Sequence, residues 1–428
     1  MKGTELPATY AEMFDFDDIE SFFNLFILLY ADDTVILSES DKDLQKGLDA
    51  LCEYCKSNSL EINVNKTKIV VFSRGKIRRL PVFTYNNSNV EIVFDYKYLG
   101  VVFNYNNRFQ KAMKNQCNSA TRAIFSLLKK SRKLDLPIDL QLDLYDKCVR
   151  SILLYGGEMW GFENTEMLEK IQLKYLKMLL GVKVSTPSCM VYGELGIYPL
   201  AIEISLRLLV YWLKLCKDFL NGSNKLSVVM FRLNNSSYAI NNDNKWIDFV
   251  HNTLDRLGLG YIHQTPLQQD YSLNQFKTLV KKRLIDQYQQ TWREEIDRNH
   301  ICITYRLIKT KFCFEKYLIR LSPLTRRNLL KFRLSTHRLP IQQLRYTDIP
   351  RHNRLCTLCN MGELGDEFHY LFNCKHQEIS NSRKIYLSKF YHINPNVIKM
   401  HHLFNSASVK KQIKLSKFIS TIFLYAQN

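Results

Sequence analysis

The sequence predicts an α+β protein in which short strands come first and helices follow. In about the first 105 residues, short runs rich in Ile, Val, Phe and Tyr alternate with turn residues, and one helical pattern covers residues 41–57. From Phe109 to about residue 335, apolar residues recur mostly at helical spacing. A cluster of cysteines and histidines in residues 356–376 then predicts a small zinc-binding module, because these side chains are the usual zinc ligands.

Charge is spread unevenly over the chain. Residues 1–75 hold 7 Lys and Arg against 14 Asp and Glu, a net charge of −7, whereas the remaining residues carry +26. A strongly basic body indicates a polyanionic partner, most often nucleic acid, although a basic protein without such a partner has the same composition. Scattered cysteines and an acidic N-terminal region predict an intracellular protein, nuclear or cytoplasmic and not secreted. No apolar run approaches the ~20 residues that span a bilayer, so we expect no membrane partner.

Turn residues and apolar runs predict the N-terminal elements. Residues 22–37 are expected to form two strands around a tight turn at Ala31-Asp32-Asp33, and Ser40 caps the following helix with Asp43 as its capping-box partner. Cys52 and Cys55 lie on the apolar face of that helix and are expected to pack in the core. A further strand is expected at Ile69–Phe72, and a second strand pair at Val90–Phe94 and Tyr98–Phe103, divided by Asp95-Tyr96-Lys97. Downstream, the Asn-rich residues 234–244 are the best linker candidate.

Two adjacent carboxylates interrupt the apolar run "LLYADDTVIL". At the tip of a hairpin, Asp32 and Asp33 would hold negative charge at the edge of a core, which suits divalent cations because the ions offset the repulsion between the carboxylates. Ala-Asp-Asp is also the sequence of an ordinary hairpin turn, and for the tripeptide alone this is the better interpretation.

Four segments in order resemble motifs of reverse transcriptases from non-LTR, LINE-like retrotransposons. "YADD" is similar to the catalytic hairpin, "LEINVNKTKIVVF" to the next palm motif, "YKYLGVVF" to the primer-grip hairpin, and "ILLYGGEMWG" to a thumb segment. The resemblance implies five segments: a partial palm at 1–108, a helical thumb-like region at 109–220, a basic helical connection at 221–334, a zinc-binding domain at 335–380 and a basic tail at 381–428.

The resemblance also implies roles for single residues in the palm. Asp32 and Asp33 would bind Mg²⁺ or Mn²⁺ for two-metal nucleotidyl transfer, and Tyr30 would lie beside the incoming nucleotide or the template. Lys66 is the expected basic residue near the leaving pyrophosphate and Lys68 is the alternative, although either lysine is equally well a solvated surface charge.

The implied substrates are an RNA template, a DNA primer or target, and deoxynucleoside triphosphates as the only small molecules. Tyr98, Leu99 and Gly100 would contact the primer end through their backbone. Without the resemblance, this tripeptide is a plain strand with a glycine kink.

A palm of this family also needs a third carboxylate from an earlier strand, and fingers that hold the nucleotide. Only 31 residues precede Asp32, and Asp15, Asp17 and Asp18 lie too close to leave room for the intervening helix. Alignment of the reactants alone can supply ~7–11 kcal/mol of barrier lowering. We therefore expect a truncated palm that is inactive alone, and a missing N-terminal polymerase half is a candidate partner. The alternative is a non-catalytic RNA- or DNA-binding protein that uses the basic helices and the zinc module.

Four residues near the C-terminus have the spacing of a closed zinc site: Cys356, Cys359, His369 and Cys374. Three thiolates and one imidazole form a tetrahedral set suited to structural Zn²⁺. His376 is a rival for the fourth position. With the preceding "THRLP" and "IPRHNRLC", the cluster resembles the zinc-binding domain that follows many non-LTR reverse transcriptases.

Residues 305–345 hold 11 Lys and Arg against a single acid. Five aromatic residues are interleaved with them: Tyr305, Phe312, Phe314, Tyr317 and Phe332. Basic side chains can neutralise phosphates and aromatic rings can stack on unpaired bases, but amphipathic helices with a solvated basic face have the same pattern. We expect the aromatic rings to face mostly inward and the basic groups to face nucleic acid.

Overall fold

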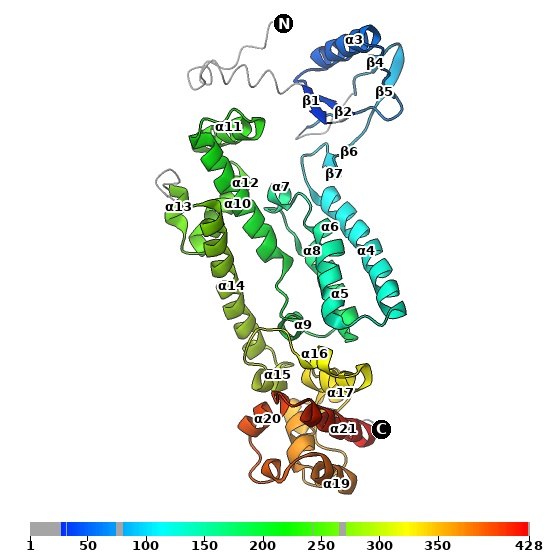
Figure 1. The fold of residues 1–428 in the computed structure, drawn as a ribbon, viewed down its shortest axis with the longest axis vertical. Coiled ribbons are helices and arrows are strands. Elements are labelled where there is room, and N and C mark those ends of the chain that lie inside the picture. The colour runs from blue at the N-terminus through cyan, green and yellow to red at the C-terminus, as the bar shows by residue number, and fades with distance from the viewer. Residues whose placement is uncertain (1–26, 31, 74–79, 242, 265–270, 427–428) are drawn as a thin grey trace. The chain divides into compact units, whose positions relative to one another are not determined.

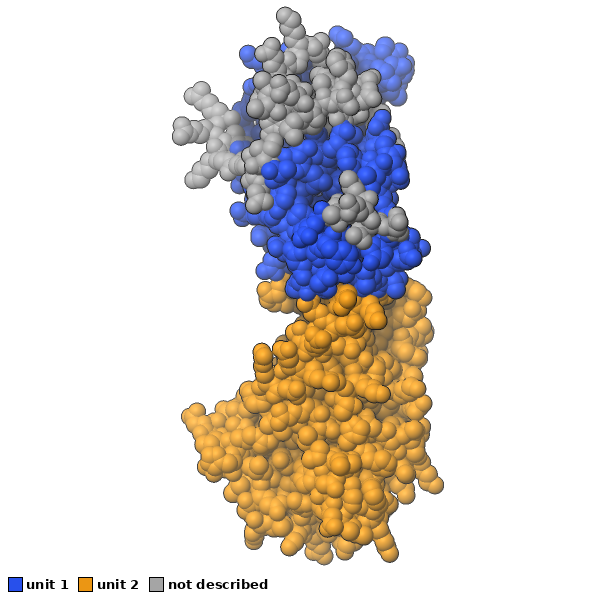
Figure 2. Space-filling model, turned by 90° about the vertical axis from the view of Figure 1, so that its left-hand side faces the viewer, with its two compact units in different colours: residues 1–116, 155–165, 204–280 blue, residues 117–154, 166–203, 281–428 orange. Residues whose placement is uncertain are grey.

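The computed structural model describes residues 27–30, 32–73, 80–241, 243–264 and 271–426 (Figure 1). Its contacts divide the chain into two compact units, unit 1 with residues 1–116, 155–165 and 204–280, and unit 2 with residues 117–154, 166–203 and 281–428 (Figure 2). Every strand that the structure describes belongs to unit 1, and helices form most of the remaining described chain, which confirms the α+β class. The predicted division into five segments stays a prediction.

The hairpin that carries the paired aspartates is present. Strands β1 (Ile27–Tyr30) and β2 (Asp33–Ile36) pair antiparallel, with Tyr30 opposite Asp33. Asp32 therefore lies in the turn and Asp33 begins the second strand, as the sequence predicts. Residues 22–26 of the predicted first strand lie outside the described residues.

Helix α3 (Asp41–Ser57) follows the hairpin and begins at the predicted cap. The Ser40 hydroxyl accepts a hydrogen bond from the Asp43 amide (3.2 Å) and donates one to the Asp43 carboxylate (2.7 Å). Cys52 and Cys55 are buried, which confirms that they are core residues. A hydrophobic cluster joins α3 to the neighbouring strands through Leu48, Cys52, Ile69, Phe83, Tyr85 and Val90.

Three short strands form the second sheet. They are β3 (Lys68–Ile69), β4 (Phe83–Tyr85) and β5 (Ser88–Ile92), with β5 in the centre, antiparallel to β4 and parallel to β3. The predicted strand at Ile69–Phe72 is thus confined to its first residue. Asn86 and Asn87, with φ of 46° and 60°, form the turn between β4 and β5. Two positive φ angles define the hairpin turn that Asn favours, a signal that the sequence analysis did not use.

The predicted pairing of Val90–Phe94 with Tyr98–Phe103 is wrong. Instead, β6 (Asp95–Tyr98) pairs antiparallel with β7 (Val101–Asn104), so Leu99 and Gly100 form the turn rather than a strand. Both turn residues have positive φ, 45° and 84°. Glycine tolerates this conformation without strain, which makes Leu99-Gly100 a better turn than the polar residues 95–97 that were expected there.

Helices make up most of the described chain after Gln110. The first seven are α4 (Gln110–Lys133), α5 (Ile138–Tyr145), α6 (Ser151–Leu153), α7 (Gly157–Trp160), α8 (Glu166–Leu180), α9 (Ser188–Leu195) and α10 (Leu200–Leu220). The predicted apolar stripe of α4 is buried at Met113, Cys117, Ala120, Ile124 and Leu127.

The remaining helices are α11 (Leu226–Asn241), α12 (Lys245–Arg256), α13 (Gly260–Gln264), α14 (Leu273–Arg298), α15 (Ile303–Ile308), α16 (Tyr317–Arg320), α17 (Pro323–Arg333), α18 (Pro340–Gln343), α19 (Gln377–Tyr386), α20 (Val397–Phe404) and α21 (Val409–Ala426). The linker prediction for residues 234–244 is wrong as far as Asn241, because α11 runs through this segment. Its buried Val228, Val229 and Phe231 anchor the helix despite the Asn-rich second half. In unit 2, α21 packs against α17 and α19.

Hydropathy singles out one part of the described chain. No single described helix has the length and apolar composition needed to cross a membrane. Helices α9 and α10 have that length and composition only when taken together, and they are bent by 72° relative to each other.

Candidate catalytic hairpin and metal centre

The hairpin presents the paired aspartates to solvent. The Asp32 and Asp33 side chains are exposed, and Tyr30, opposite Asp33 in the register, is 62 % exposed. Both carboxylates are therefore accessible to a hydrated cation. Among the described residues, the only group of three or more His, Cys, Asp or Glu with converging ligand atoms is the C-terminal Cys/His cluster. The described chain thus offers the hairpin two carboxylates and no third ligand.

The segment around the two candidate lysines is a turn closed by Asn63. The Asn63 side-chain oxygen accepts the Lys66 amide (3.1 Å), and its backbone carbonyl accepts the Thr67 amide and hydroxyl (both 3.0 Å). Asn63 and Thr67 therefore shape the backbone of this segment. The Lys68 ammonium pairs with Glu91 (2.6 Å), whereas the Lys66 side chain is exposed. This contrast favours Lys66 as the lysine available to a ligand.

The Tyr98-Leu99-Gly100 segment is supported by Tyr155, from the "ILLYGGEMWG" segment. The Tyr155 hydroxyl donates to the Leu99 carbonyl (2.8 Å), and a Cβ at Gly100 would lie 3.2 Å from the Tyr155 ring. The Tyr155 carbonyl in turn accepts hydrogen bonds from Gln116 (2.6 Å) and the fully buried Trp160 (3.0 Å). Two motifs that are 56 residues apart are thus in contact. Sequence reasoning singled out both segments but missed Tyr155 as the support of the turn.

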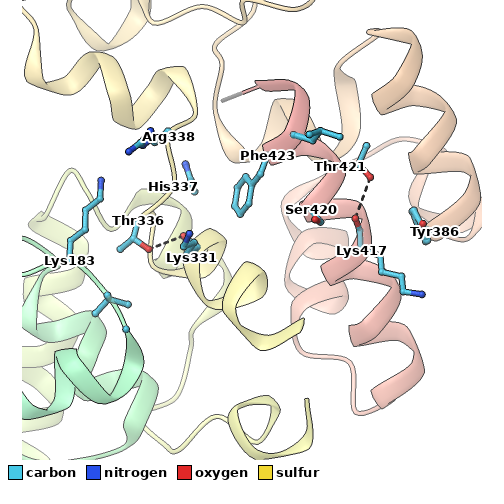
Figure 3. Close-up of a pocket in the computed structure, with 13 residues that line it drawn as sticks. Lys183, Lys331, Thr336, His337, Arg338, Tyr386, Lys417, Ser420, Thr421 and Phe423 are labelled. Carbon is cyan, nitrogen blue, oxygen red and sulfur yellow. Dashed lines mark hydrogen bonds between the residues drawn. The ribbon is translucent and has the colours of Figure 1, made fainter. Parts of the chain in front are cut away.

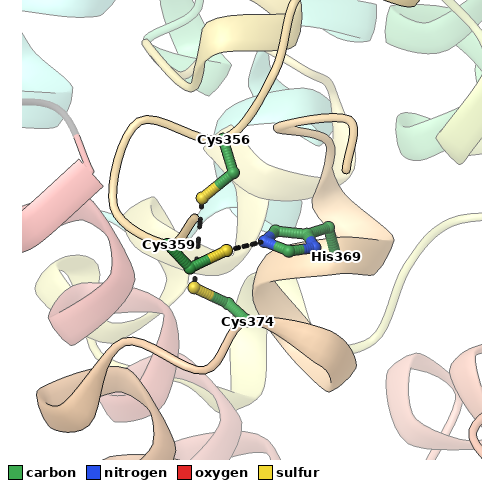
Figure 4. A group of neighbouring side chains, drawn as sticks. All are labelled: Cys356, Cys359, His369 and Cys374. Atoms are coloured by element: carbon green, nitrogen blue, oxygen red, sulfur yellow. Dashed lines mark hydrogen bonds between the residues drawn. The ribbon is translucent and has the colours of Figure 1, made fainter. Parts of the chain in front are cut away.

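The four predicted zinc ligands converge on one point (Figure 4). The ligand atoms of Cys356, Cys359, His369 and Cys374 all lie within 4.8 Å of one another. The sulfurs of Cys356 and Cys374 are 4.0 Å apart, and the Cys359 sulfur is 3.3 Å from the His369 Nε2 atom. Zn–S and Zn–N bonds of about 2.3 and 2.0 Å give tetrahedral edges of about 3.5–3.8 Å. The donor set and its geometry therefore fit zinc.

The ligand loop is held by its own backbone. The Cys356 amide donates to the Glu363 carbonyl (2.9 Å), and the Leu358 amide donates to the Cys356 sulfur (3.4 Å). Gly362 has φ of 64°, and a Cβ at Gly365 would lie 2.9 Å from Pro340. These two glycines allow the loop to turn back and bring the first cysteine pair to His369 and Cys374.

A carboxylate orients the histidine ligand. Glu363 lies 2.7 Å from the His369 Nδ1 atom, which leaves Nε2 facing the sulfurs. Such outer hydrogen bonds orient zinc-bound histidines. Burial lowers the pKa of His369, but hydrogen bonds to Cys356 and Glu363 outweigh burial and raise the pKa to about 9. Protons and zinc therefore compete for this ring.

His376, the rival fourth ligand, does not join the group. It precedes α19, and its ring packs against Tyr425 with 5.5 Å between the centroids. Arg383 instead stabilises this end of the site, donating to the carbonyls of Leu371 (2.7 Å) and Cys374 (3.0 Å). The geometry favours His369 as the ligand.

The "THRLP" segment is tied to the zinc loop through a buried acid. The His337 Nδ1 atom accepts the Leu339 amide (3.3 Å), so Nε2 carries the proton and donates to Glu367 (2.9 Å). Glu367 also accepts hydrogen bonds from Thr304 (2.8 Å) and Ser335 (3.0 Å). Burial raises the pKa of Glu367, but its hydrogen bonds, that from His337 first among them, outweigh burial and lower the pKa to about 2.

A buried ion pair was not visible in the sequence. Glu194 of α9 and Arg333 of α17 have fully buried side chains, with 2.6 Å between the carboxylate and Nε. Tyr317 (2.7 Å) and Tyr305 (3.2 Å) donate to the same carboxylate. Tyr305, Tyr317 and Phe332 are buried, whereas Phe312 and Phe314 are half-buried, so the aromatic rings of residues 305–345 face mostly inward as expected.

Comparison with known proteins matches the N-terminal part of the chain to one family. Residues 9–103 match the family model described as reverse transcriptase (RNA-dependent DNA polymerase). Over 162 residues, the chain is 31% identical to the RNA-directed DNA polymerase from mobile element jockey of Drosophila funebris, an alignment that covers 36% of this chain and 17% of that protein. Over 170 residues it is 26% identical to an uncharacterized transposon-derived protein of Caenorhabditis elegans, covering 38% of this chain and 59% of that protein.

The chain thus matches less than two thirds of the length of either relative. No solved structure matches it. The matched residues include the aspartate hairpin, α3 and most of the β6–β7 hairpin. Residues 9–103 therefore match the reverse transcriptase family, and both matches support the resemblance to the polymerases of non-LTR, LINE-like retrotransposons.

Proposed function

We propose that this chain takes part in RNA-directed DNA synthesis, with Asp32 and Asp33 as the ligands of Mg²⁺ or Mn²⁺. The observation that carries the proposal is the pair of exposed carboxylates at a hairpin tip, inside the segment that matches the reverse transcriptase family. When bound, the two metals of such a site stabilise the attacking and leaving oxygens of a phosphoryl transfer. RNA is then the template, and a DNA end is the primer.

The neighbouring residues have roles that suit this chemistry. Lys66, exposed on its turn, offsets negative charge on the leaving pyrophosphate, since a lysine ammonium is a point charge that binds phosphates. Tyr30, 62 % exposed next to the aspartates, offers a ring to the nucleotide or template base. Tyr98, Leu99 and Gly100 hold the primer end through the backbone of a turn that Tyr155 fixes.

We further propose that this 428-residue chain does not synthesise DNA alone. Two-metal transfer of the family kind uses a third carboxylate, and the described residues bring none to the hairpin. Asp15, Asp17 and Asp18 lie outside the described residues. A third carboxylate and a surface for the incoming nucleotide would be supplied by a further polymerase segment, and the complex would work in the nucleus or cytoplasm.

Zinc at Cys356, Cys359, His369 and Cys374 has a structural role in the proposal. Four protein ligands leave no open position for substrate, as in closed structural sites. The metal would link the loop before Glu363 to the segment that leads into α19.

A second candidate is a non-catalytic nucleic-acid-binding protein. The observation that favours it is the basic lining of the hollows in unit 2, at Lys183, Lys331 and Lys417 among others. The two candidates differ at the hairpin, because a binding protein is indifferent to Asp32→Asn.

Metal binding and synthesis are tested separately. Manganese binding to zinc-loaded protein, followed by electron paramagnetic resonance, should be lost in Asp32→Asn/Asp33→Asn, whereas equal binding by both proteins would refute the metal site. Primer extension on an RNA template should be absent for the chain alone. If the chain alone extends the primer and Asp32→Asn/Asp33→Asn does not, the catalytic hairpin is confirmed. The proposal that the chain does not polymerise alone is then refuted.

A further inference from the structure

Three hollows in unit 2 lie next to one another and share lining residues. The largest, about 840 Å³, lies between the segment around Lys183, the start of the "THRLP" segment and helix α21 (Figure 3). Lys183 and His337 line both the first and the second hollow, and Gln342 and Arg345 line both the second and the third. The three hollows therefore adjoin one another, and together they are called here the basic groove.

The walls of the groove are strongly basic. They contain the side chains of Lys183, Lys331, Arg338, Arg345, Arg351, Arg354 and Lys417. Glu367 is the single acid in the three linings. It is buried, and its carboxylate accepts a hydrogen bond from His337. Within the described chain, none of the seven basic groups forms an ion pair with Asp or Glu. Arg354 donates to the carbonyls of Ile349 (3.0 Å) and Ile341 (3.3 Å), and the charge of Arg351 acts on Asp366. The positive charge of the other five groups is left for a ligand.

The basic groups also act on one another. Burial lowers the pKa of Lys331, and the charges of Arg327, Arg338 and Lys183 lower it further. In Figure 3, Lys183 and Arg338 lie on one side of the hollow, and Lys417 comes from α21 on the other. Positive charges that face one another across a hollow repel, and a polyanion between them would relieve the repulsion.

An exposed aromatic residue lies in the middle of the groove. Tyr346 is 67 % exposed in the second hollow, and the guanidinium of Arg345 sits 4.8 Å from its ring centroid. Arg345 also donates to the Tyr346 hydroxyl (2.7 Å), which fixes the ring. Proteins that bind unpaired strands combine such basic tracks with exposed rings on which bases stack, whereas a duplex hides the faces of its bases.

We propose that the basic groove binds the phosphate backbone of a single-stranded nucleic acid, with a base stacked on Tyr346. The inference rests on the proposed function only for the presence of such a strand, and it needs no chemistry at Asp32 or Asp33. Arg351 and Arg354 lie just before Cys356, so zinc would hold this end of the groove in place.

The test measures binding of labelled oligo-uridine and oligo-deoxythymidine to zinc-loaded full-length protein by fluorescence anisotropy. The groove variant is Lys183→Gln/Lys331→Gln/Arg338→Gln/Lys417→Gln. The matched control, Lys384→Gln/Lys389→Gln/Lys410→Gln/Lys411→Gln, removes four exposed charges outside the three linings. Thermal unfolding and zinc content establish that both variants are folded.

Losing four phosphate contacts should reduce the slope of log K against log salt by about 3, since each contact on a single strand contributes about 0.7. At each salt concentration between about 50 and 200 mM KCl, we expect the Kd of the groove variant to lie at least about tenfold above that of the unmodified protein, and the Kd of the control to differ much less. Tyr346→Ala should weaken binding by about five- to a hundredfold with an unchanged salt slope. The tighter of the two oligonucleotides identifies the strand as RNA or DNA.

Equal losses in the groove and control variants would overturn the proposal, because binding would then depend on total charge. Equal affinity for a duplex of the same length would overturn the assignment to an unpaired strand. The catalytic hairpin is read out separately, by manganese binding to Asp32→Asn/Asp33→Asn. A failure of the groove is thus distinguishable from a failure of the catalytic hairpin.

Discussion

Replacing Glu194 by Gln removes the negative charge at the centre of the buried network in unit 2. The carboxylate accepts four hydrogen bonds, from Nε (2.6 Å) and Nη2 (3.3 Å) of Arg333 and from the hydroxyls of Tyr317 (2.7 Å) and Tyr305 (3.2 Å). Arg333 is fully buried and would keep only Glu315, 3.4 Å away, as its partner. Breaking one side of a buried pair costs about 3–5 kcal/mol, because it leaves an uncompensated charge.

Urea unfolding of Glu194→Gln should show this loss as a lower midpoint with an unchanged slope. The control is Glu166→Gln, which breaks an exposed ion pair with Lys170 on α8 and should leave the urea midpoint nearly unchanged. Glu194→Gln/Arg333→Met removes both charges and should recover part of the stability. A loss below about 1 kcal/mol for Glu194→Gln would refute the reasoning.

Three further predictions concern pH, zinc and the primer-grip-like turn. Burial raises the pKa of Glu169 to about 7 from its ordinary 4.5, so the protonated carboxyl stabilises the fold fully below pH 4.5 and this contribution is lost as pH rises through 7. Glu169→Gln should remove about 3 kcal/mol of that pH dependence, measured from urea midpoints across this range, and an unchanged profile would contradict it. Metal analysis should find one zinc per chain in the unmodified protein and in His376→Ala, and none in His369→Ala. The reverse result would show that His376, and not His369, is the fourth zinc ligand. Gly100→Ala, at φ of 84° and with a Cβ 3.2 Å from Tyr155, should lower stability by about 1–2 kcal/mol in thermal unfolding, and no loss would show that the turn tolerates a side chain.

Local spacing predicted several parts of the fold well. The aspartate hairpin, the Ser40 cap and the apolar stripe of α4 all depend on residues within a few positions of one another. The zinc ligand set also lies within a short segment, Cys356 to Cys374. Turn chemistry was the weak point, since Leu99-Gly100 and Asn86-Asn87 adopt the positive φ angles of hairpin turns in segments expected to be strand or loop.

The sequence by itself determined the order of motifs, the charge imbalance, the metal-ligand spacings and the α+β class, because these follow from residue type and short-range periodicity. Only the tertiary structure decided which charges are buried and which remain open to a ligand. Glu194 and Arg333, 139 residues apart, became a buried pair, whereas Lys183, Lys331 and Lys417 came together along an unpaired basic groove. The physical reason is that desolvation and charge pairing depend on contacts between residues far apart in the chain, which short-range patterns do not encode.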